Sequence, residues 1–480
     1  MLDERVREVL AEAGRRVIPT EEEERRVRAL CSRLVDRVSA AARRVMAEAT
    51  VAPQGSVVKG TWLRGAVDFD IFVLLPPSLT KKGLGEVGLR IAREAMEGYE
   101  QIDRYAEHPY LECVVPFDGG EARVDIVPCY RVERGMWLSA TDRTPYHTEY
   151  VSRRLKESEN LANETRLFKA FLRGIGIYGA EIRVQGFSGY ACELVTIRYG
   201  SFVDALRSAS RWRRGEVVDV EGHYRGREHE ARRLFGDAPL IIVDPIDERR
   251  NVAAALSLDS FELLIAAAHS FLRRPSLSFF FAPEVELLDE VGLRERIRSI
   301  GGNLLLVRFG RVPTKAPDVL WGQLYKTRDA LKGLLRAFDF RISRTWVWSD
   351  EKENSAILFK LESLELPMSK LHGGPPAHAT ADSERFLEKN LGAPATVFGP
   401  WIERGRWAVE LRRRYASARD LLKDKLSDGG REVGIARLVA EAIRGGFEIL
   451  CDDEIWSLYR ANEAFARAFT RFLAGRPVWL

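Results

Sequence analysis

The sequence has 480 residues, of which 46% are hydrophobic and 30% are charged. This composition excludes a disordered or collagen-like chain, and the length exceeds what one hydrophobic core supports, so roughly two to four domains are expected. The 74 Lys and Arg residues against 70 Asp and Glu give a net charge of +4, which is only weak support for an anionic partner.

Neither the apolar segments nor the cysteines indicate a membrane or an oxidising compartment. The longest apolar runs, such as 71–75 and 279–282, are far shorter than the roughly 18 to 20 residues of a membrane span. The N-terminus is charged from Asp3 onward and does not have the pattern of a signal peptide. The five cysteines show no CxxC spacing, so neither a structural zinc site nor a disulfide framework is expected. We therefore expect a cytoplasmic protein with no membrane segment.

The first 150 residues are predicted to form a mixed α/β unit. A helix is expected over 21–49, because Thr20 and Glu23 form a capping box ahead of an apolar stripe at helical spacing. The elements expected after it are a strand over 68–75, a helix over 86–99, and strands over 110–117 and 121–129 joined by the hairpin turn Asp118-Gly119-Gly120.

The rest of the chain changes its pattern twice. A predominantly helical region is expected first, with helices over 161–173, 189–199 and 256–272. Beyond Pro275 the pattern is that of a small sheet covered by helices, with strands over 303–310, 340–349 and 355–364 and a helix over 320–338. A break at 373–376 then leads into a long helical region over 401–428 and two further helical stretches.

Three aspartates carry the chemistry that the sequence suggests. Asp68 and Asp70 are residues i and i+2 of an expected strand, so their carboxylates project from the same face. Asp125 lies in the second strand of the hairpin between apolar neighbours, where an unpaired acid would be costly to bury. Carboxylates this close repel each other unless divalent cations lie between them, and Mg²⁺ accepts oxygen ligands from carboxylates and phosphates. The three acids together predict a two-metal site that activates a hydroxyl and braces a triphosphate.

The turn at Gly55-Ser56 supplies the second half of the expected site. Its backbone amides, the serine hydroxyl and a helix start over 61–64 would form a cradle for β- and γ-phosphates. Lys59 and Arg64 add positive charge nearby. A Gly-Ser pair or an Asp-x-Asp in isolation is usually an ordinary turn or an exposed strand start. The combined spacing, with a third aspartate on a later strand, favours catalysis.

The pattern resembles the nucleotidyltransferase signature of the DNA polymerase β superfamily. The stretches GSVVKGTWLRG at 55–65 and DFDIFV at 68–73 closely resemble the archaeal, class I, CCA-adding enzymes, which are tRNA nucleotidyltransferases. The resemblance runs from about residue 55 to residue 390 and is looser beyond. The further matching segments are 142–148, 169–178 with 186–190, 244–254 and 317–320.

The resemblance implies a multidomain fold of mixed α/β and α+β class. It would consist of a polymerase-β-like nucleotidyltransferase head (1–150), a helical nucleotide-binding neck (151–275), a small-sheet α+β body (276–390) and a helical tail (391–480). Body and tail would bind tRNA, and the active site would lie between head and neck. The family also offers a precedent for a homodimer built through the tail, which no feature of this sequence demonstrates.

The reaction that the resemblance implies is template-independent addition and repair of CCA at the 3′ end of tRNA, using CTP and ATP. The tRNA 3′-hydroxyl would attack the α-phosphate and pyrophosphate would leave, with Asp68, Asp70 and Asp125 as catalytic residues and as ligands of two Mg²⁺ ions. A poly(A) polymerase or an oligoadenylate synthetase would share the same turn and acids and stays an alternative. A non-catalytic tRNA-binding protein is a second alternative, which the presence of all three acids disfavours.

Several nucleotide-binding residues can be carried over from the family to matching positions. His147 would touch the triphosphate or sugar, although a surface histidine is equally expected, and Tyr178 is equally consistent with core packing. Lys169 would meet a phosphate, although a plain solvated lysine is the usual interpretation of such a position. Arg250 would read the base edge, with Arg249 as the open alternative. Together with the residues argued above, the expected nucleotide-binding set is Gly55, Ser56, Lys59, Arg64, His147, Lys169, Tyr178 and Arg250.

Recognition of tRNA is expected to depend on shape and phosphates, because every tRNA must be a substrate. A basic strip from neck to tail would serve this purpose. The helix over 320–338 also carries bases, which are equally consistent with a solvated face. The expected tRNA-binding residues are Arg412, Arg413, Arg414, Lys423 and Lys425.

Overall fold

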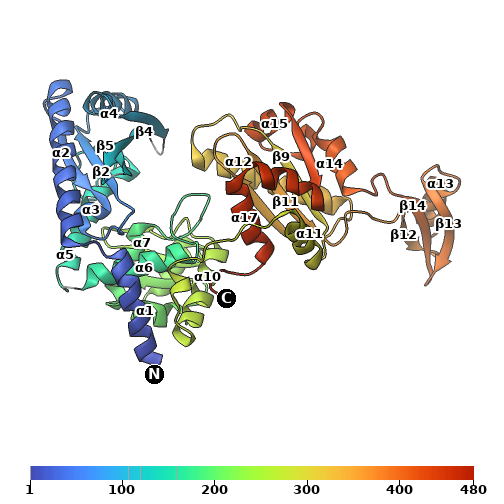
Figure 1. Cartoon of the computed structure of the whole chain (residues 1–480). Coiled ribbons are helices and arrows are strands. Elements are labelled where there is room, and N and C mark those ends of the chain that lie inside the picture. Colours follow the sequence, from blue (N-terminus) through green and yellow to red (C-terminus); the bar gives the residue numbers. More distant parts are fainter. Residues whose placement is uncertain (1, 106–107, 119, 159) are drawn as a thin grey trace. The chain divides into compact units, whose positions relative to one another are not determined.

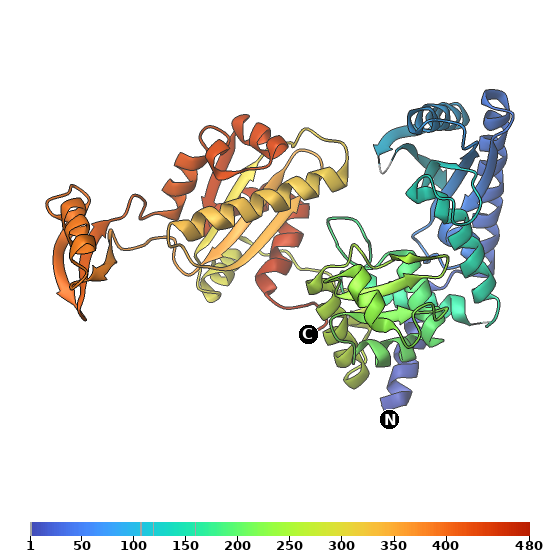
Figure 2. The ribbon, with the colours of Figure 1, turned by 180° about the vertical axis from the view of Figure 1, so that it is seen from behind.

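The computed structural model describes residues 2–105, 108–118, 120–158 and 160–480, and the chain divides into two units (Figure 1 and Figure 2). The N-terminal unit consists of Met1–Glu284 with Pro477–Leu480, and the C-terminal unit is Val285–Arg476. Among the helices of the described residues, none combines the length and the apolar character that a bilayer span requires.

A five-stranded sheet forms the first part of the N-terminal unit. Its strands are β1 (Thr50–Gln54), β2 (Asp68–Leu75), β3 (Glu100–Tyr105), β4 (Pro109–Phe117) and β5 (Gly120–Tyr130). They lie in the order β1-β2-β5-β4-β3, and only the central pair β2 and β5 is parallel. The predicted strand over 68–75 and the hairpin are confirmed, while Gly119 of the predicted turn lies outside the described residues.

Two helices, α2 (Glu21–Val45) and α4 (Lys81–Ala95), pack on one face of this sheet. The predicted capping box is confirmed, because the Thr20 hydroxyl accepts from the Glu23 amide and the Glu23 carboxylate accepts from the Thr20 amide. Helix α4 begins five residues before the predicted 86–99 helix. Phe69, Ile71 and Val73 of β2 are buried against these helices. Alternation along the strand therefore places the residues between them on the opposite face of the sheet.

The second part of the N-terminal unit is a helical core with a small sheet. The predicted helices are confirmed as α6 (Leu161–Gly174), α7 (Gly189–Tyr199) and α10 (Leu258–Arg273), around a cluster of buried phenylalanines. The region is predominantly helical as predicted, but it also contains a three-stranded sheet that was not predicted, formed by β6 (Glu216–Asp219), β7 (Leu240–Asp244) and β8 (Asp247–Asn251). The other helices are α1 (Leu2–Val17), α5 (Thr144–Leu155), α8 (Phe202–Ala209), α9 (Glu228–Phe235), η1 (Ala140–Arg143) and η2 (Leu277–Phe279).

The C-terminal unit is built on a four-stranded sheet in the order β10-β11-β9-β15. The predicted strands and the long helix are confirmed, with the bounds β9 (Leu304–Phe309), β10 (Ile342–Ser349), β11 (Ser355–Leu361) and α12 (Pro317–Ala337). Both faces are covered. One packs against α12, α14 (Ala418–Leu426) and α15 (Arg437–Arg444), and the other against α11 (Glu290–Ser299), α16 (Trp456–Ala461) and α17 (Glu463–Ala474). Figure 2 shows α12 lying across its face of the sheet.

The prediction of a long helical region over 401–428 is confirmed only for its last part, α14, and is wrong for the residues before it. Instead β13 (Thr396–Glu403) and β14 (Arg406–Arg412) form a hairpin that joins β12 (Ser369–Pro376) in a second sheet, with α13 (Thr380–Asn390) packed on it. Arg404 and Gly405 both have positive φ, which suits a tight two-residue hairpin turn. The predicted break at 373–376 lies within β12. Strand β15 (Phe447–Cys451) completes the larger sheet, which therefore combines residues from both sides of position 390. The remaining short helices are η3 (Arg431–Val433) and η4 (Asp452–Ile455).

Candidate active site

The three predicted aspartates lie together on the face of the sheet that α2 and α4 leave uncovered. In the parallel register of β2 and β5, Asp70 is directly opposite Asp125, and Asp68 is directly opposite Arg123. Residues directly opposite on neighbouring strands project from the same face. Phe69 of β2 and Val124 of β5 point to the buried core on the other side. The structure thus brings the acids together by strand alternation and register.

Gly55 makes close contact with the acids possible. It has a φ of +73°, and a Cβ built at this position would lie only 1.8 Å from Oδ2 of Asp70. It also begins α3 (Gly55–Lys59), a helix of five residues that includes Ser56. The cradle was expected to gain a helix start if residues 61–64 were helical; they are not, because α3 ends at Lys59 and no helix follows before β2. The turn that was expected to precede a helix is itself the first turn of one.

Burial makes the two inner carboxyl groups hard to ionise together. Desolvation raises the pKa of Asp125 to about 7, although Arg123 opposes the shift, and the charge of Asp70 adds to it. Desolvation also raises the pKa of Asp70, with Lys59 acting in the opposite direction. Neighbouring buried acids of this kind titrate as a pair, and a cation between them is what allows both to be charged.

Arg123 supplies the positive charge nearest to these acids. Its Nη2 donates to Oδ2 of Asp68 at 2.9 Å, and its Nε lies 3.9 Å from Oδ2 of Asp125. The guanidinium therefore partly neutralises two of the three carboxylates. It makes only one hydrogen-bonded contact with them, so their remaining oxygens stay available.

Unsatisfied oxygens indicate that a cation fits here. Oδ1 of Asp125 is buried without a hydrogen-bond partner, and so is Oε1 of Gln54, which lies opposite Asp70 on β1. Buried acceptors are normally paired, so these two mark a place where something is expected to bind. Carboxylate and amide oxygens are the ligands that Mg²⁺ prefers. Among the described residues, no three acidic, His or Cys side chains are arranged as a ready metal-binding group.

Two of the predicted lysines meet at one buried carboxylate. Nζ of Lys59 lies 2.6 Å from Oε2 of Glu193, and Nζ of Lys169 lies 3.0 Å from Oε1 of the same residue. Thr61 joins them, since its hydroxyl donates to Oε1 of Glu193 at 2.7 Å and accepts from Lys169 at 2.9 Å. Lys169, which was expected to meet a phosphate, is instead buried with its side chain only 2% exposed, and its ammonium group is held by Glu193 and Thr61.

A second buried carboxylate, Asp244, organises His147 and Arg250. Nε2 of His147 and Nη1 of Arg250 each lie 2.8 Å from Oδ2 of Asp244, and the Tyr190 hydroxyl donates to Oδ1 at 3.1 Å. The His147 ring also packs on the Tyr190 ring, with centroids 4.1 Å apart. Burial lowers the pKa of His147, and the hydrogen bond to Asp244 opposes this. His147 is therefore a fixed, partly buried residue, and the surface-histidine alternative does not apply.

Both arginines of the open choice line a cavity of about 750 Å³ in the N-terminal unit. Arg250 is held by Asp244, whereas Arg249 is exposed and has no ion-pair partner among the described residues. Trp137, Phe235 and Arg143 also line this cavity, so it offers aromatic surface beside three guanidinium groups. Such a combination can stack against and hydrogen-bond a flat, polar ring.

Tyr178 and Arg64 have different surroundings. Tyr178 packs against the helical core, where burial raises its pKa, and it pairs with Phe187 in an isolated bridge. A Cβ added at Gly189 would lie 3.3 Å from its hydroxyl and 3.5 Å from Nζ of Lys169, so both groups lie at the start of α7. Arg64 instead pairs with Glu23 of α2 at 2.8 Å and is not brought to the acids.

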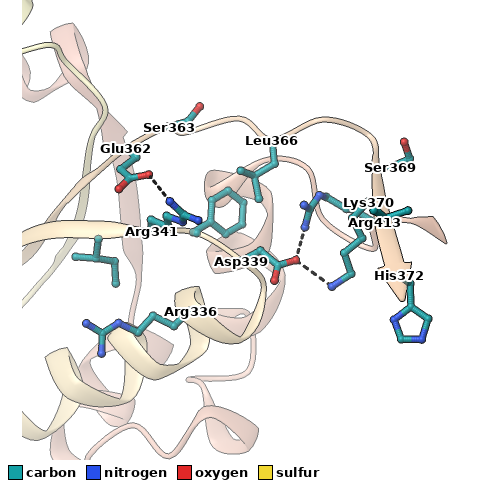
Figure 3. A pocket seen from close by; sticks show the side chains of 13 residues that line it. Arg336, Asp339, Arg341, Glu362, Ser363, Leu366, Ser369, Lys370, His372 and Arg413 are labelled. Atoms are coloured by element: carbon teal, nitrogen blue, oxygen red, sulfur yellow. Dashed lines mark hydrogen bonds and ion pairs between the residues drawn. The ribbon is translucent and has the colours of Figure 1, made fainter. Parts of the chain in front are cut away.

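The predicted tRNA-binding residues lie in the C-terminal unit and fall into two groups. Arg412, Arg414 and Lys423 are exposed and have no acidic partner among the described residues. Arg413 and Lys425 are paired, with Asp339 and Glu432 respectively. Figure 3 shows that Lys370 and Arg413 both point toward Asp339. Asp339, Lys370 and Arg413 line a cavity of about 1030 Å³. Its other basic lining residues are Arg336, Arg341 and His372.

Four site residues were missed by reasoning from the sequence: Gln54, Arg123, Glu193 and Asp244. Gln54 and Arg123 stand beside predicted residues, but nothing local distinguishes them from other polar strand positions. A signal for Glu193 does exist, because it is the only charged residue in the apolar segment 191–197. An acid at such a position must be paired.

Comparisons with known proteins show which family the chain is similar to. The family model described as nucleotidyltransferase domain matches residues 31–148, that of the second domain of tRNA nucleotidyltransferase matches 163–281, and that of the C-terminal domain of CCA-adding enzymes matches 301–452. A CCA-adding enzyme of Methanosarcina barkeri is 40% identical, over 91% of this chain and 92% of that protein. One from Methanopyrus kandleri is 35% identical, over 98% of each.

Among solved structures, one of the Cid1 poly(U) polymerase aligns with a TM-score of 0.46 and 16% sequence identity, covering 57% of this chain and 97% of that one. This likeness is too distant to carry an argument about function.

Proposed function

The chain belongs to the family of CCA-adding enzymes, which are tRNA nucleotidyltransferases, and from this premise we propose a specific reaction and the residues that perform it. The enzyme adds C, C and A to the 3′ end of tRNA from CTP and ATP, releases pyrophosphate, and repairs ends that have lost these nucleotides. The observation that carries the proposal is that Asp70 and Asp125 lie directly opposite each other on adjacent strands. Oδ1 of Asp125 is buried there without a hydrogen-bond partner.

The acids hold the reacting groups through divalent cations. Asp68, Asp70 and Asp125 are the proposed ligands of two Mg²⁺ ions, which when bound would lower the pKa of the tRNA 3′-hydroxyl and offset the charge of the triphosphate. Gly55 keeps the backbone of the β1 to α3 turn against Asp70, so Ser56 and the first turn of α3 lie beside the metal ligands. No covalent bond to the protein is needed, because positioning and electrostatics carry the transfer.

The remaining contacts divide between triphosphate and base. Lys59 and Lys169 supply positive charge for the triphosphate, since both are held beside the start of α7. His147, held by Asp244, contacts the sugar or phosphates, and Tyr178 lies beside Lys169. Arg250 reads the base edge from the same Asp244 anchor, with Arg249 as the alternative in the same cavity.

We assign tRNA binding to the C-terminal unit. Arg412, Arg414 and Lys423 are exposed cations that can contact phosphates directly. Arg413 and Lys425 would have to exchange a carboxylate partner for a phosphate. The cavity around Asp339 adds further basic side chains to this surface. A homodimer through this unit stays a prediction, which the molecular mass in solution tests.

Asp125→Asn tests the metal assignment. With tRNA that lacks its last three nucleotides, the wild type is expected to add CCA from CTP and ATP and then stop. The variant should lose on the order of 1000-fold or more in rate, because a metal ligand is removed, with tRNA affinity within a few fold of wild type. Mg²⁺ should raise the melting temperature of the wild type and have much less effect on the variant.

Asp103→Asn is the matched control, because Asp103 lies in an exposed ion pair with Arg93 on the edge strand of the same sheet. This variant should keep full activity. Normal transfer by Asp125→Asn would contradict the metal assignment. Unlimited addition of A, or failure to use CTP, would instead favour a poly(A) polymerase.

A further inference from the structure

Glu193 lies at the centre of a charged cluster in the N-terminal unit that is almost completely buried. Its side chain is 0% exposed, and those of Lys59 and Lys169 are 9% and 2% exposed. The three residues come from α7, α3 and α6, so the carboxylate joins the nucleotidyltransferase sheet region to the helical core. A buried ionic contact between distant segments is expensive to form unless each charge is compensated, so this cluster requires a functional explanation.

The charge balance of the cluster shows what the carboxylate does. Two ammonium groups buried side by side would repel each other and lose their hydration, and one carboxylate between them offsets most of that cost. Burial alone would raise the pKa of Glu193, but Lys169 and Lys59 outweigh this and hold that pKa well below its usual range. Glu193 is thus ionised, and the cluster keeps a net charge of one positive unit.

The geometry also fixes how the two ammonium groups are directed. Each oxygen of Glu193 holds one lysine, Oε2 at 2.6 Å from Lys59 and Oε1 at 3.0 Å from Lys169. Lys169 is further held by the hydroxyl and carbonyl oxygens of Thr61, at 2.9 and 3.3 Å. Lys59 has Glu193 as its hydrogen-bond partner and lies 5.9 Å from the Tyr190 ring centroid, so it keeps donors for another acceptor.

The cluster is also coupled to the metal-binding acids. Lys59 is close enough to Asp70 to act against the effect of burial on the pKa of that carboxyl. Glu193, which holds the ammonium group of Lys59, therefore influences both the triphosphate-binding lysines and the metal-binding carboxylates of the site.

We propose that Glu193 is a positioning residue of the nucleotide site: one carboxylate oxygen directs the Lys59 ammonium group toward the triphosphate, and the other holds Lys169, whose three donors are engaged by Glu193 and Thr61, behind it as a fixed positive charge. This inference rests on the proposed role of the two lysines in binding the nucleotide. Glu193 itself does not contact the substrate, because its negative charge would repel phosphate and its oxygens are engaged by Lys59, Lys169 and Thr61.

Glu193→Gln tests the proposal, because it keeps the shape of the side chain and removes the charge. One charge-assisted hydrogen bond to each lysine is weakened, so the KM for CTP and the Kd for CTP should rise on the order of 10- to 100-fold. The kcat at saturating CTP should fall much less, and the affinity for tRNA should stay within about twofold. Glu193→Asp keeps the charge on a shorter stem, and its KM should lie between those of wild type and Glu193→Gln.

Glu24→Gln is the matched control. Glu24 pairs with Arg166 at 3.2 Å and also joins α2 to α6, but it lies in a separate ion pair that does not include either lysine. If this variant raises the KM for CTP as much as Glu193→Gln does, the effect is one of general docking and the proposal is overturned. If Glu193→Gln does not fold, an unchanged KM for CTP in a folded Glu193→Asp variant overturns it equally.

The proposed function and the positioning role of Glu193 can be rejected separately. If wild-type protein does not extend truncated tRNA with CTP and ATP, the proposed function itself fails. If the wild type is active and both Glu193 variants bind CTP normally, only the positioning role of Glu193 is rejected.

Discussion

Gly55 shows how a single missing side chain makes the site. Its φ of +73° is in the left-handed region, and the space where a Cβ would go is filled by the carboxylate of Asp70. Gly65 has almost the same φ, +72°, yet a Cβ there would meet no atom within 4 Å. Comparing alanine variants of the two glycines therefore separates backbone strain from displacement of the Asp70 carboxylate.

Alanine at either glycine should cost roughly 1 to 2 kcal/mol of unfolding free energy, because both positions require left-handed backbone. Only Gly55→Ala should also lose activity, on the order of 100-fold, because Asp70 must move from its position. Urea unfolding measures the first quantity and the initial rate of CMP addition the second. Equal activity of the two variants would show that the close approach of Gly55 to Asp70 has no role in transfer.

His147 should make the stability of the protein depend on pH. Burial holds its pKa below the usual value of 6.5, with Asp244 opposing, so the folded state takes up a proton less readily than the unfolded state. Its contribution is full above about pH 6.5 and is lost as the pH falls below that value. His147→Gln should therefore flatten the decrease in unfolding free energy between pH 7 and pH 5, measured by urea titration.

His229, which is exposed on α9, provides the control, because its replacement by glutamine should leave the pH dependence as in the wild type. A wild-type slope in His147→Gln would mean that other groups carry the dependence.

At the scale of the elements, the parts that were predicted correctly are those whose signal is local. The capping box of α2, the alternation in β2 and the length of α7 each depend on a few neighbouring residues. The convergence of Asp70 and Asp125 follows from two such strands and a parallel register. The sequence could indicate this pairing, because each aspartate lies within a recognisable strand pattern, 68–75 for Asp70 and 121–129 for Asp125.

The elements that were mispredicted depend on distant partners. Strand β14 has alternating character in Trp407, Val409 and Leu411, but its charged neighbours also fit a helix, and only pairing with β12 and β13 decides between them. The same holds for residues of the site. Glu193 is 134 residues from Lys59, and Asp244 is 97 residues from His147, so no local pattern shows that these acids organise predicted cations.

For the whole molecule, the chain path connects the two units twice. The C-terminal unit, Val285–Arg476, interrupts the N-terminal unit, which is completed by Pro477–Leu480. In that last segment Trp479 is only 9% exposed, and its ring stacks on Phe279 with centroids 5.1 Å apart. The core that supports α6 and its lysine therefore includes a residue that follows the C-terminal unit in the chain.

Trp479→Ala should weaken the N-terminal unit selectively. Truncating a buried aromatic side chain costs about 3 to 5 kcal/mol, and the loss falls on the packing around Phe279 and α10. Amide hydrogen exchange should therefore speed up in α6, α10 and η2, while amides of β9, β11 and α12 in the C-terminal unit keep wild-type rates. Leu480→Ala is the control, because Leu480 is 64% exposed and its loss should change neither set. Faster exchange in both units would show that they unfold as one cooperative body, and unchanged exchange in α10 would show that Trp479 does not support this core.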